Sequence, residues 1–437
     1  MRRRARDGRR NNMTRAALRA LAAAAFLAEG LAAHAQETVF YSTQLRPIEE
    51  ASKVRDVLLK GAPRKVIYVV DEPSPFAVRM KAETQTGKRT FSLVGALHGE
   101  LQPHVPEDLQ PIDEVGAIVA NRGIPENLME LGKLGTAQQQ YVPWMQATNV
   151  MVASKQALPY LPAGADLNAL TYAQLQQWAK AIADRTGQRR LGFPAGPTGL
   201  MHRFFQGYLY PSFTGGVVTT FKSAEAEAGW AAMKDLWAVS NPNSTNYNFM
   251  QEPLLAGEVW IAWDHIARLK EALAIQPDQF VAFPAPAGPK GRGYMPLISG
   301  LAIPRDAPDR AGAMAVIEHM TKPATQLMTA AEVGFLPVVK VDLPPDMAPD
   351  IKLLAGAVAA THDAKDALVS LPPVGLGAKG GEFNKVYTDT FQRIVLRNEA
   401  IRTVLGEHAK TLEALIKETG APCWPPDRAS KGACPVD

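Results

Sequence analysis

The 437-residue sequence contains only two cysteines, and its apolar runs fall short of the roughly 20 residues that a membrane-spanning helix needs. It also lacks the GxSxG, HExxH, GxxxxGK(S/T) and CxxC patterns. These patterns mark a hydrolase nucleophile, a zinc protease, a phosphate-binding loop and a thiol redox pair. We therefore expect a protein that is not an enzyme, with no catalytic residues and no cofactor.

Metal and nucleotide signals are weak in the rest of the chain. The histidines after residue 35 show no metal-ligand spacing, so we expect no metal site. One GxGxxG match occurs at Gly375, Gly377 and Gly380, but it follows Leu-Pro-Pro instead of a strand, which favours a flexible loop over a nucleotide cradle. Basic residues are scattered through the chain, so nucleic acid is not an expected partner.

The N-terminus has the composition of an export signal. Residues 1–35 contain eight arginines and two acidic residues. The whole chain has a formal net charge of +4, and without this segment the remainder carries about −2. An apolar run follows at 20–27, and a small-residue site ends at Ala35. These features predict a signal peptide cleaved near Ala35, with either Met1 or Met13 as the start. Because no cysteine follows the site, we expect a soluble periplasmic protein without a lipid anchor.

Both cysteines lie in a tail rich in proline and glycine, at Cys423 and Cys434. In an oxidising compartment a single disulfide closing a small loop is favoured over free thiols. A metal pair is disfavoured because the tail offers no further ligands.

Hydrophobic patterning predicts an α/β protein. Strand-like segments at 39–43, 65–70 and 91–96 alternate with helical spacing at 48–59 and 76–84, as in a parallel sheet covered by helices. The extended segment 141–153 is expected to cross into a second lobe, and 297–303 with 310–320 to return a strand and a helix to the first. The length of the chain also favours two domains.

The segment 254–337 places LLAGEVWIAWDH, FPAPAGPKG, SGLAIPRDAPDR and GFLP in one fixed order. This order resembles the later half of family 1 extracellular solute-binding proteins of ATP-binding cassette (ABC) importers, including the maltose-binding-protein-like sugar receptors. The resemblance implies a two-lobed, type II-like periplasmic-binding-protein fold. Each lobe would be a mainly parallel sheet flanked by helices, and crossing hinge strands would join the lobes. The expected divisions are lobe I at 36–145 plus 288–325, and lobe II at 146–287 plus 326–437 with C-terminal helices and the cysteine-containing tail.

The same resemblance nominates ligand contacts. Trp263 and Asp264 match the cleft-facing end of a family strand, where a stacking ring beside a carboxylate would suit a sugar. Asp264 could instead cap the following helix. Further candidates lie at strand ends, turns and the proposed hinge: Tyr294, Thr198, His98, Ser42, Thr43, Trp144, Gln146 and Tyr210.

These expectations imply a monomeric receptor that captures a sugar, oligosaccharide or polyol and delivers it to an inner-membrane ABC permease. Three other ligands remain open within the same fold: a polyamine, a metal chelate and a phosphorylated polyol. A cationic ligand would need converging carboxylates, from Asp264, Glu258 and Asp71 or Glu72. A phosphorylated ligand would favour Arg292, Arg203 or Lys290. A secreted hydrolase is the alternative of another class.

Overall fold

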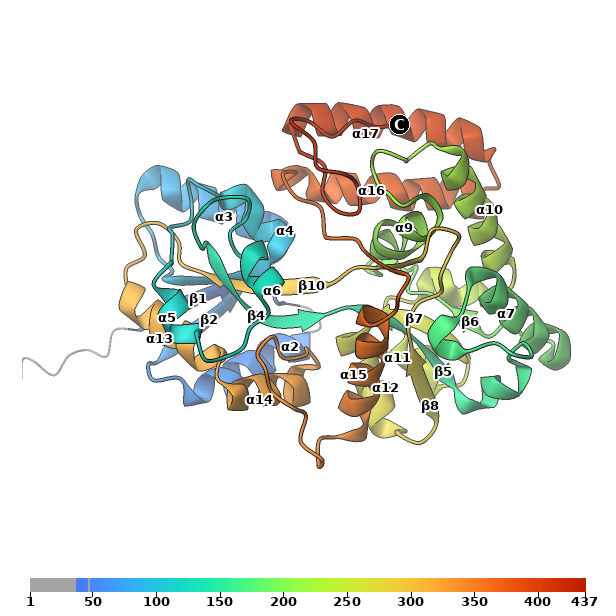
Figure 1. Ribbon diagram of the computed structural model, residues 1–437, viewed down its shortest axis with the longest axis horizontal. Coiled ribbons are helices and arrows are strands. Elements are labelled where there is room, and N and C mark those ends of the chain that lie inside the picture. The colour runs from blue at the N-terminus through green and yellow to red at the C-terminus, as the bar shows by residue number, and fades with distance from the viewer. Residues whose placement is uncertain (1–36, 46–47) are drawn as a thin grey trace, which may run out of the picture.

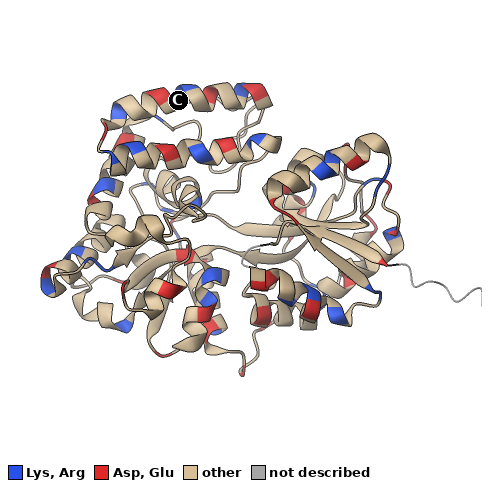
Figure 2. Cartoon of the chain, turned by 180° about the vertical axis from the view of Figure 1, so that it is seen from behind, with Lys and Arg blue, Asp and Glu red and all other residues tan. Residues whose placement is uncertain are grey.

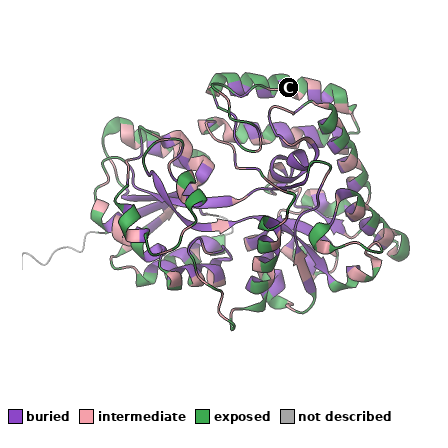
Figure 3. Cartoon of the chain, viewed as in Figure 1, coloured by how far each residue is buried: buried purple, intermediate pink, exposed green. Residues whose placement is uncertain are grey.

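The computed structural model describes residues 37–45 and 48–437, which form two α/β lobes side by side (Figure 1). The predicted signal peptide and its cleavage site near Ala35 lie outside the described residues. In both lobes the strands are buried while the outer faces of the helices are exposed (Figure 3). This distribution is expected of sheets covered by helices on both faces.

The first lobe contains a five-stranded sheet in the order β2-β1-β3-β10-β4. The bounds are β1 Thr38–Ser42, β2 Val66–Val70, β3 Leu93–Leu97, β4 Tyr141–Ala147 and β10 Leu297–Ala302. Strand β1 pairs in parallel with β2 and β3, whereas β10 runs antiparallel to both β3 and β4. The sheet is therefore mixed, where we expected a mainly parallel one, because two of its strands belong to the connections between lobes.

Helices cover both faces of this sheet, with α3 and α4 on one face and α2 and α14 on the other (Figure 1). Their bounds are α2 Ile48–Lys53, α3 Pro73–Thr86, α4 His98–Leu101, α5 Val115–Val119, α6 Glu126–Leu131, α13 Arg310–Met320 and α14 Pro323–Val333. Helix α14 packs against α2 and β4. This contact favours a lobe boundary after Val333 over the expected one at 325.

The second lobe contains a four-stranded sheet in the order β6-β7-β5-β8. Its strands are β5 Asn149–Ser154, β6 Leu191–Gly192, β7 Ile261–His265 and β8 Phe280–Phe283. Only β6 and β7 pair in parallel, so this sheet is mainly antiparallel, contrary to our expectation. A smaller parallel pair joins β9 Arg292–Tyr294 to β11 Ala367–Val369.

Many helices surround this second sheet, and α16 and α17 lie together at one end of the lobe (Figure 1). The bounds are α7 Tyr172–Thr186, α8 Met201–Phe204, α9 Tyr210–Thr214, α10 Ala224–Ala238, α11 Gln251–Leu255, α12 Ile266–Ile275, α15 Pro349–His362, α16 Gly380–Phe391 and α17 Ile401–Thr419. A π-helical turn, η6 Phe205–Leu209, joins α8 to α9. Lys, Arg, Asp and Glu are interspersed along these outer helices (Figure 2).

Three connections cross between the lobes. The predicted extended segment 141–153 forms β4 in one sheet and β5 in the other, with Thr148 at the crossing. The Thr148 hydroxyl lies 2.9 Å from the Tyr208 hydroxyl and donates to the Met295 carbonyl at 2.9 Å. The other connections are β9 to β10 and α14 to α15, and backbone hydrogen bonds pair Gln146 with Leu336. The crossing segments are thus fastened to one another.

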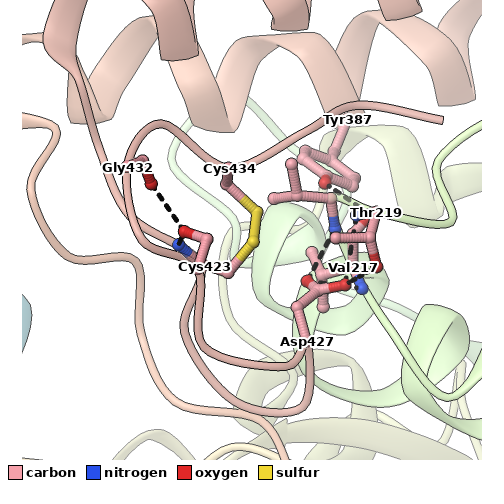
Figure 4. Close-up of a disulfide and its surroundings, with 9 residues drawn as sticks. Val217, Thr219, Tyr387, Cys423, Asp427, Gly432 and Cys434 are labelled. Atoms are coloured by element: carbon pink, nitrogen blue, oxygen red, sulfur yellow. Dashed lines mark hydrogen bonds between the residues drawn. A yellow bond between two sulfur atoms is a disulfide. The ribbon is translucent and has the colours of Figure 1, made fainter.

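The C-terminal tail folds back onto the second lobe, where the predicted disulfide joins Cys423 to Cys434 (Figure 4). Asp427, between the two cysteines, accepts hydrogen bonds from the backbone amides of Val217, Val218 and Thr219. The tail is therefore held by a covalent loop and by a buried carboxylate.

Candidate functional site

Two adjoining cavities of about 520 and 330 Å³ lie between the lobes. Both are lined by Glu72, Pro73, Leu97, Glu100, Arg203 and Leu297. Because the lining comes from both lobes and from the segment before α16, we treat the two volumes as one site, called here the interlobe cavity.

The first-lobe wall is built at the ends of β1 and β3. Thr43 directly follows β1, and Glu100 lies in the turn of helix that follows β3. The Thr43 hydroxyl donates to Glu100 Oε2 at 2.7 Å, and the Leu97 amide donates to the same oxygen at 2.9 Å. Burial raises the pKa of Glu100, and these hydrogen bonds oppose the rise. The carboxyl group is held in place by one oxygen.

Glu50 contributes a second carboxyl group to this wall, from the end of the first turn of α2. Its side chain is 5% exposed, and its Oε1 is buried without a hydrogen-bond partner. Burial raises the pKa of Glu50 to about 8, although the positive charge of Arg268 opposes this change. Glu50 is therefore mainly protonated at neutral pH, and within the described chain its Oε1 makes no hydrogen bond.

The second-lobe wall carries two guanidinium groups, Arg203 of α8 and Arg268 of α12. Arg268 donates to the Asn248 carbonyl at 3.1 Å and lies over the Phe249 ring, 4.4 Å from its centroid. Burial and the neighbouring Arg268 lower the pKa of Arg203 to about 10, so Arg203 remains charged at neutral pH. Across residues 37–45 and 48–437, no group accepts a hydrogen bond from the Arg203 guanidinium.

Two histidines beside these arginines are neutral. Burial, with the charges of Arg203 and Arg268, lowers the pKa of His202 to about 3 and holds the pKa of His265 well below its usual value. His265 also caps α12, because its Nδ1 accepts from the Ala267 amide at 3.2 Å. The positive charge of this wall therefore comes from the two arginines.

A C-terminal segment, 372–381, closes a third side of the interlobe cavity. The Gly375 amide donates to Gln102 Oε1 of the first lobe at 2.7 Å. The predicted loop at Gly375, Gly377 and Gly380 is a turn that leads into α16. The nucleotide-binding fingerprint requires a strand directly before its glycines, and no strand lies between β11 and this turn.

The structure brings two of the predicted contacts, Thr43 and Thr198, to the interlobe cavity. Thr198 is exposed, and its amide donates to Asn248 Oδ1 at 2.9 Å. Both residues remain predicted ligand contacts.

Trp263 and Asp264 are placed differently from our expectation, because helices cover the end of β7. Trp263 is fully buried, with its ring edge-to-face against Phe204 and Tyr208 at centroid distances of 5.1 Å. Asp264 is also fully buried and accepts from the amides of Met250 at 2.9 Å and His265 at 2.7 Å. Neither side chain lines the cavity, and Asp264 orders the chain at the start of α11 instead of capping α12.

The other six predicted contacts are also engaged inside the protein and do not line the interlobe cavity. Their partners are Ser42 with the Gln44 amide, His98 with the Tyr141 hydroxyl, Trp144 with the Ser299 hydroxyl, Gln146 with the Pro337 carbonyl, Tyr210 with Trp230 and Phe221, and Tyr294 with the His362 ring. Their polar atoms and rings pack inside the lobes or hold the crossing segments together.

Sequence reasoning missed Glu50, Glu100, Arg268 and His202, and it named Arg203 only as one of three candidates for a phosphorylated ligand. Of the other two, Arg292 is buried beside Asp366 and Lys290 does not line the interlobe cavity. The available signal for Glu100 was its place three residues after a strand end, where ligand contacts gather in α/β folds.

Among the described residues, no group of histidine, cysteine, aspartate and glutamate side chains is arranged to hold a metal ion. Within the same part of the chain, no helix combines the length and apolar character needed to cross a membrane.

Solved structures of other proteins share this architecture. Solved structures with the same fold include the GacH receptor of Streptomyces glaucescens, studied unliganded and with acarbose (TM-score 0.69, 15% identity, covering 87% of this chain and 98% of that one). Maltose-bound MalE3 of T. maritima gives a TM-score of 0.69 at 18% identity, with 87% and 99% covered. UgpB from Mycobacterium tuberculosis in complex with glycerophosphocholine gives 0.67 at 17%, with 87% and 98% covered.

These identities show a shared fold, and no curated protein sequence matches the chain. The model of the bacterial extracellular solute-binding protein family matches residues 97–327, more than half of the chain. The match confirms the resemblance that rested on 254–337. The chain belongs to the bacterial extracellular solute-binding protein family.

Proposed function

We propose that this protein is the periplasmic receptor of an ABC importer, which captures a sugar, oligosaccharide or polyol between its lobes and delivers it to an inner-membrane permease. The observation that carries the proposal is the interlobe cavity, lined by both lobes. A solute that contacts both walls favours the closed arrangement of lobes joined by crossing segments. The GacH and MalE3 structures, with acarbose and maltose, support a carbohydrate ligand.

The polar groups of the cavity suit hydroxyl groups. Thr43, Gln44 and Glu100 on one wall face Thr198 and Arg203 on the other. Fixed hydroxyl, amide and carboxyl groups determine how polar ligands are oriented in such sites. Trp263 is buried away from the cavity, so the polar groups named above are the proposed source of recognition.

The alternative of a polyamine has less support from the residues first considered. Asp264 is buried against backbone amides, and Glu258 accepts from the Tyr247 hydroxyl at 2.6 Å. Asp71 accepts from the Tyr41 hydroxyl at 3.0 Å. Of these four carboxylates only Glu72 lines the cavity, so the set considered from the sequence does not converge.

A thermal-shift screen of the mature protein against sugars and polyols tests the proposal. A ligand that binds only the native state stabilises it by roughly 2.7 kcal/mol at a hundredfold excess over Kd. We expect the variant Thr43→Val to weaken this shift, whereas Thr419→Val, at the end of α17 away from the cavity, should leave it unchanged. Equal shifts in wild type and Thr43→Val would contradict the site, and turnover of the added sugar would favour a hydrolase.

A further inference from the structure

Arg203 presents a charged group to the interlobe cavity without a partner in the described chain. Its guanidinium lies partly buried between the two cavity volumes, and it neither donates a hydrogen bond nor forms an ion pair within residues 37–45 and 48–437. A guanidinium group offers five donors in a planar fork that matches carboxylate and phosphate oxygens. A desolvated charge of this kind is costly unless an acceptor completes it.

The surroundings of Arg203 add positive charge on its own wall. Burial and the neighbouring Arg268 lower the pKa of Arg203, and burial together with the charges of both arginines lowers the pKa of His202 and of His265. The carboxyl groups that influence Arg203, Glu100 and Asp264, do not neutralise it by contact. Glu100 is bound to Thr43 and the Leu97 amide on the opposite wall, and Asp264 is bound to backbone amides beneath the cavity.

We propose that the solute is a polyhydroxylated anion, a sugar or polyol that carries a phosphate or carboxylate group. The anionic group binds Arg203, with Arg268 adding to the local positive charge. The hydroxyl groups of the solute bind Thr43, Gln44 and Glu100 on the first-lobe wall. The solute therefore bridges an acceptor-rich wall and a guanidinium wall, and this bridge is the interaction that closes the lobes. The proposal rests on the proposed function and names its substrate class.

The charged groups Glu100 and Arg203, on opposite walls, do not join the two lobes directly. Glu100 and Arg203 influence each other's pKa but form no ion pair. An anionic group supplies the missing acceptor for Arg203, whereas a neutral sugar supplies no counter-charge.

Isothermal titration calorimetry of the mature protein tests the proposal with matched pairs: glycerol and glycerol 3-phosphate, glucose and glucose 6-phosphate, galactose and galacturonate. We expect at least one anion to bind tenfold or more tightly than its neutral partner, and its affinity to fall with added salt. Phosphate and carboxylate arms distinguish the two forms of the anion. Mass spectrometry of solute released from the protein purified from periplasm should give an anion.

The variant Arg203→Gln should lose roughly 10-fold to 100-fold in affinity for the anion, the range for removing a charge-assisted hydrogen bond. Arg203→Lys keeps the charge and should lose less. Arg402→Gln is the matched control, because this exposed arginine of α17 pairs with Glu227 far from the cavity. Circular dichroism and the melting temperature confirm that each variant folds.

The outcomes separate this inference from the proposed function. If neutral sugars bind as tightly as their anionic partners, or Arg203→Gln leaves anion affinity unchanged, the anionic class is wrong and the receptor stands. If neither set binds and no solute is released from the purified protein, both proposals fail.

Discussion

The Asp427 carboxylate accepts a hydrogen bond from the Val218 amide at 2.8 Å, although the residues lie 209 positions apart. The same carboxylate accepts from the amides of Val217 at 3.0 Å and Thr219 at 3.1 Å, and also from the Thr219 hydroxyl (Figure 4). One buried side chain thus fixes both the tail and the turn that follows α9.

We expect Asp427→Ala to reduce the free energy of unfolding by about 2–4 kcal/mol, because buried amides lose their acceptor. Asp427→Asn keeps one acceptor oxygen and should cost less. Thr219→Val removes only one of the four donors and provides the control. Urea unfolding measures all three, and equal stability of Asp427→Ala and wild type would contradict the assigned role.

Removal of the disulfide should also destabilise the protein, by a separate route. The bond between Cys423 and Cys434 reduces the conformational entropy of the unfolded chain. For an 11-residue separation this stabilises the folded state by about 3 kcal/mol. We expect the double variant Cys423→Ala, Cys434→Ala to unfold at lower denaturant concentration. Reductant should lower the stability of wild type to that level and leave the double variant unchanged; an effect of reductant on the variant would contradict this account.

Trp263 should matter for stability. Its burial against Phe204 and Tyr208 predicts that Trp263→Ala costs about 3–5 kcal/mol, the range for large core aromatics. Trp260→Ala is the matched control, because Trp260 is only partly buried, beside Tyr160 and Arg190. Denaturant unfolding should show the larger loss for Trp263, and a reversed order would mean that Trp263 is not the core residue.

Glu50 predicts a pH dependence of stability. Its pKa is about 8 in the folded protein and near 4.5 when unfolded, so the folded state binds more protons between these values. Its contribution to stability is fully present below about pH 4.5 and is lost as pH rises through about 8, by at most about 1.4 kcal/mol per pH unit. Glu50→Gln should remove this slope. Unfolding free energies at pH 5, 6.5 and 8 measure the difference, and parallel profiles would refute it.

Gly99 contacts the C-terminal segment closely. A Cβ added there would lie 2.4 Å from the Pro373 carbonyl oxygen, so Gly99→Ala should displace one side and cost about 1–3 kcal/mol. Gly116→Ala in α5 has no atom within 4 Å of the new Cβ and should be neutral or slightly stabilising. Melting temperatures of the two variants test this difference. Equal melting temperatures would contradict the close contact at Gly99.

Local pattern was sufficient for much of the fold. The segments 65–70 and 91–96 became β2 and β3 within two residues, and 310–320 became α13. Apolar period and strand length act within each segment, so they are visible in the sequence. The mixed character of the sheets was missed, because the direction of β10 and β4 is set by the crossing of the chain between lobes.

The site was harder to predict for a physical reason. Glu50, Glu100, Arg203 and Arg268 come from four separate elements and meet only when the lobes face each other. Aromatic residues near turns looked accessible in the sequence, but α8 and η6 bring Phe204 and Tyr208 onto Trp263 and bury it. Thr43 and Thr198, named from their places after a strand end and a tight turn, line the interlobe cavity and remain predicted ligand contacts.

The hydrogen bond from the Gly375 amide to Gln102 has a consequence for the movement of the lobes. It ties the segment before α16 to the first lobe, on the same side as the contact of Gly99 with Pro373. Any motion that separates the first lobe from this segment must break the hydrogen bond. The C-terminal segment therefore restrains the first lobe as well as lining the interlobe cavity.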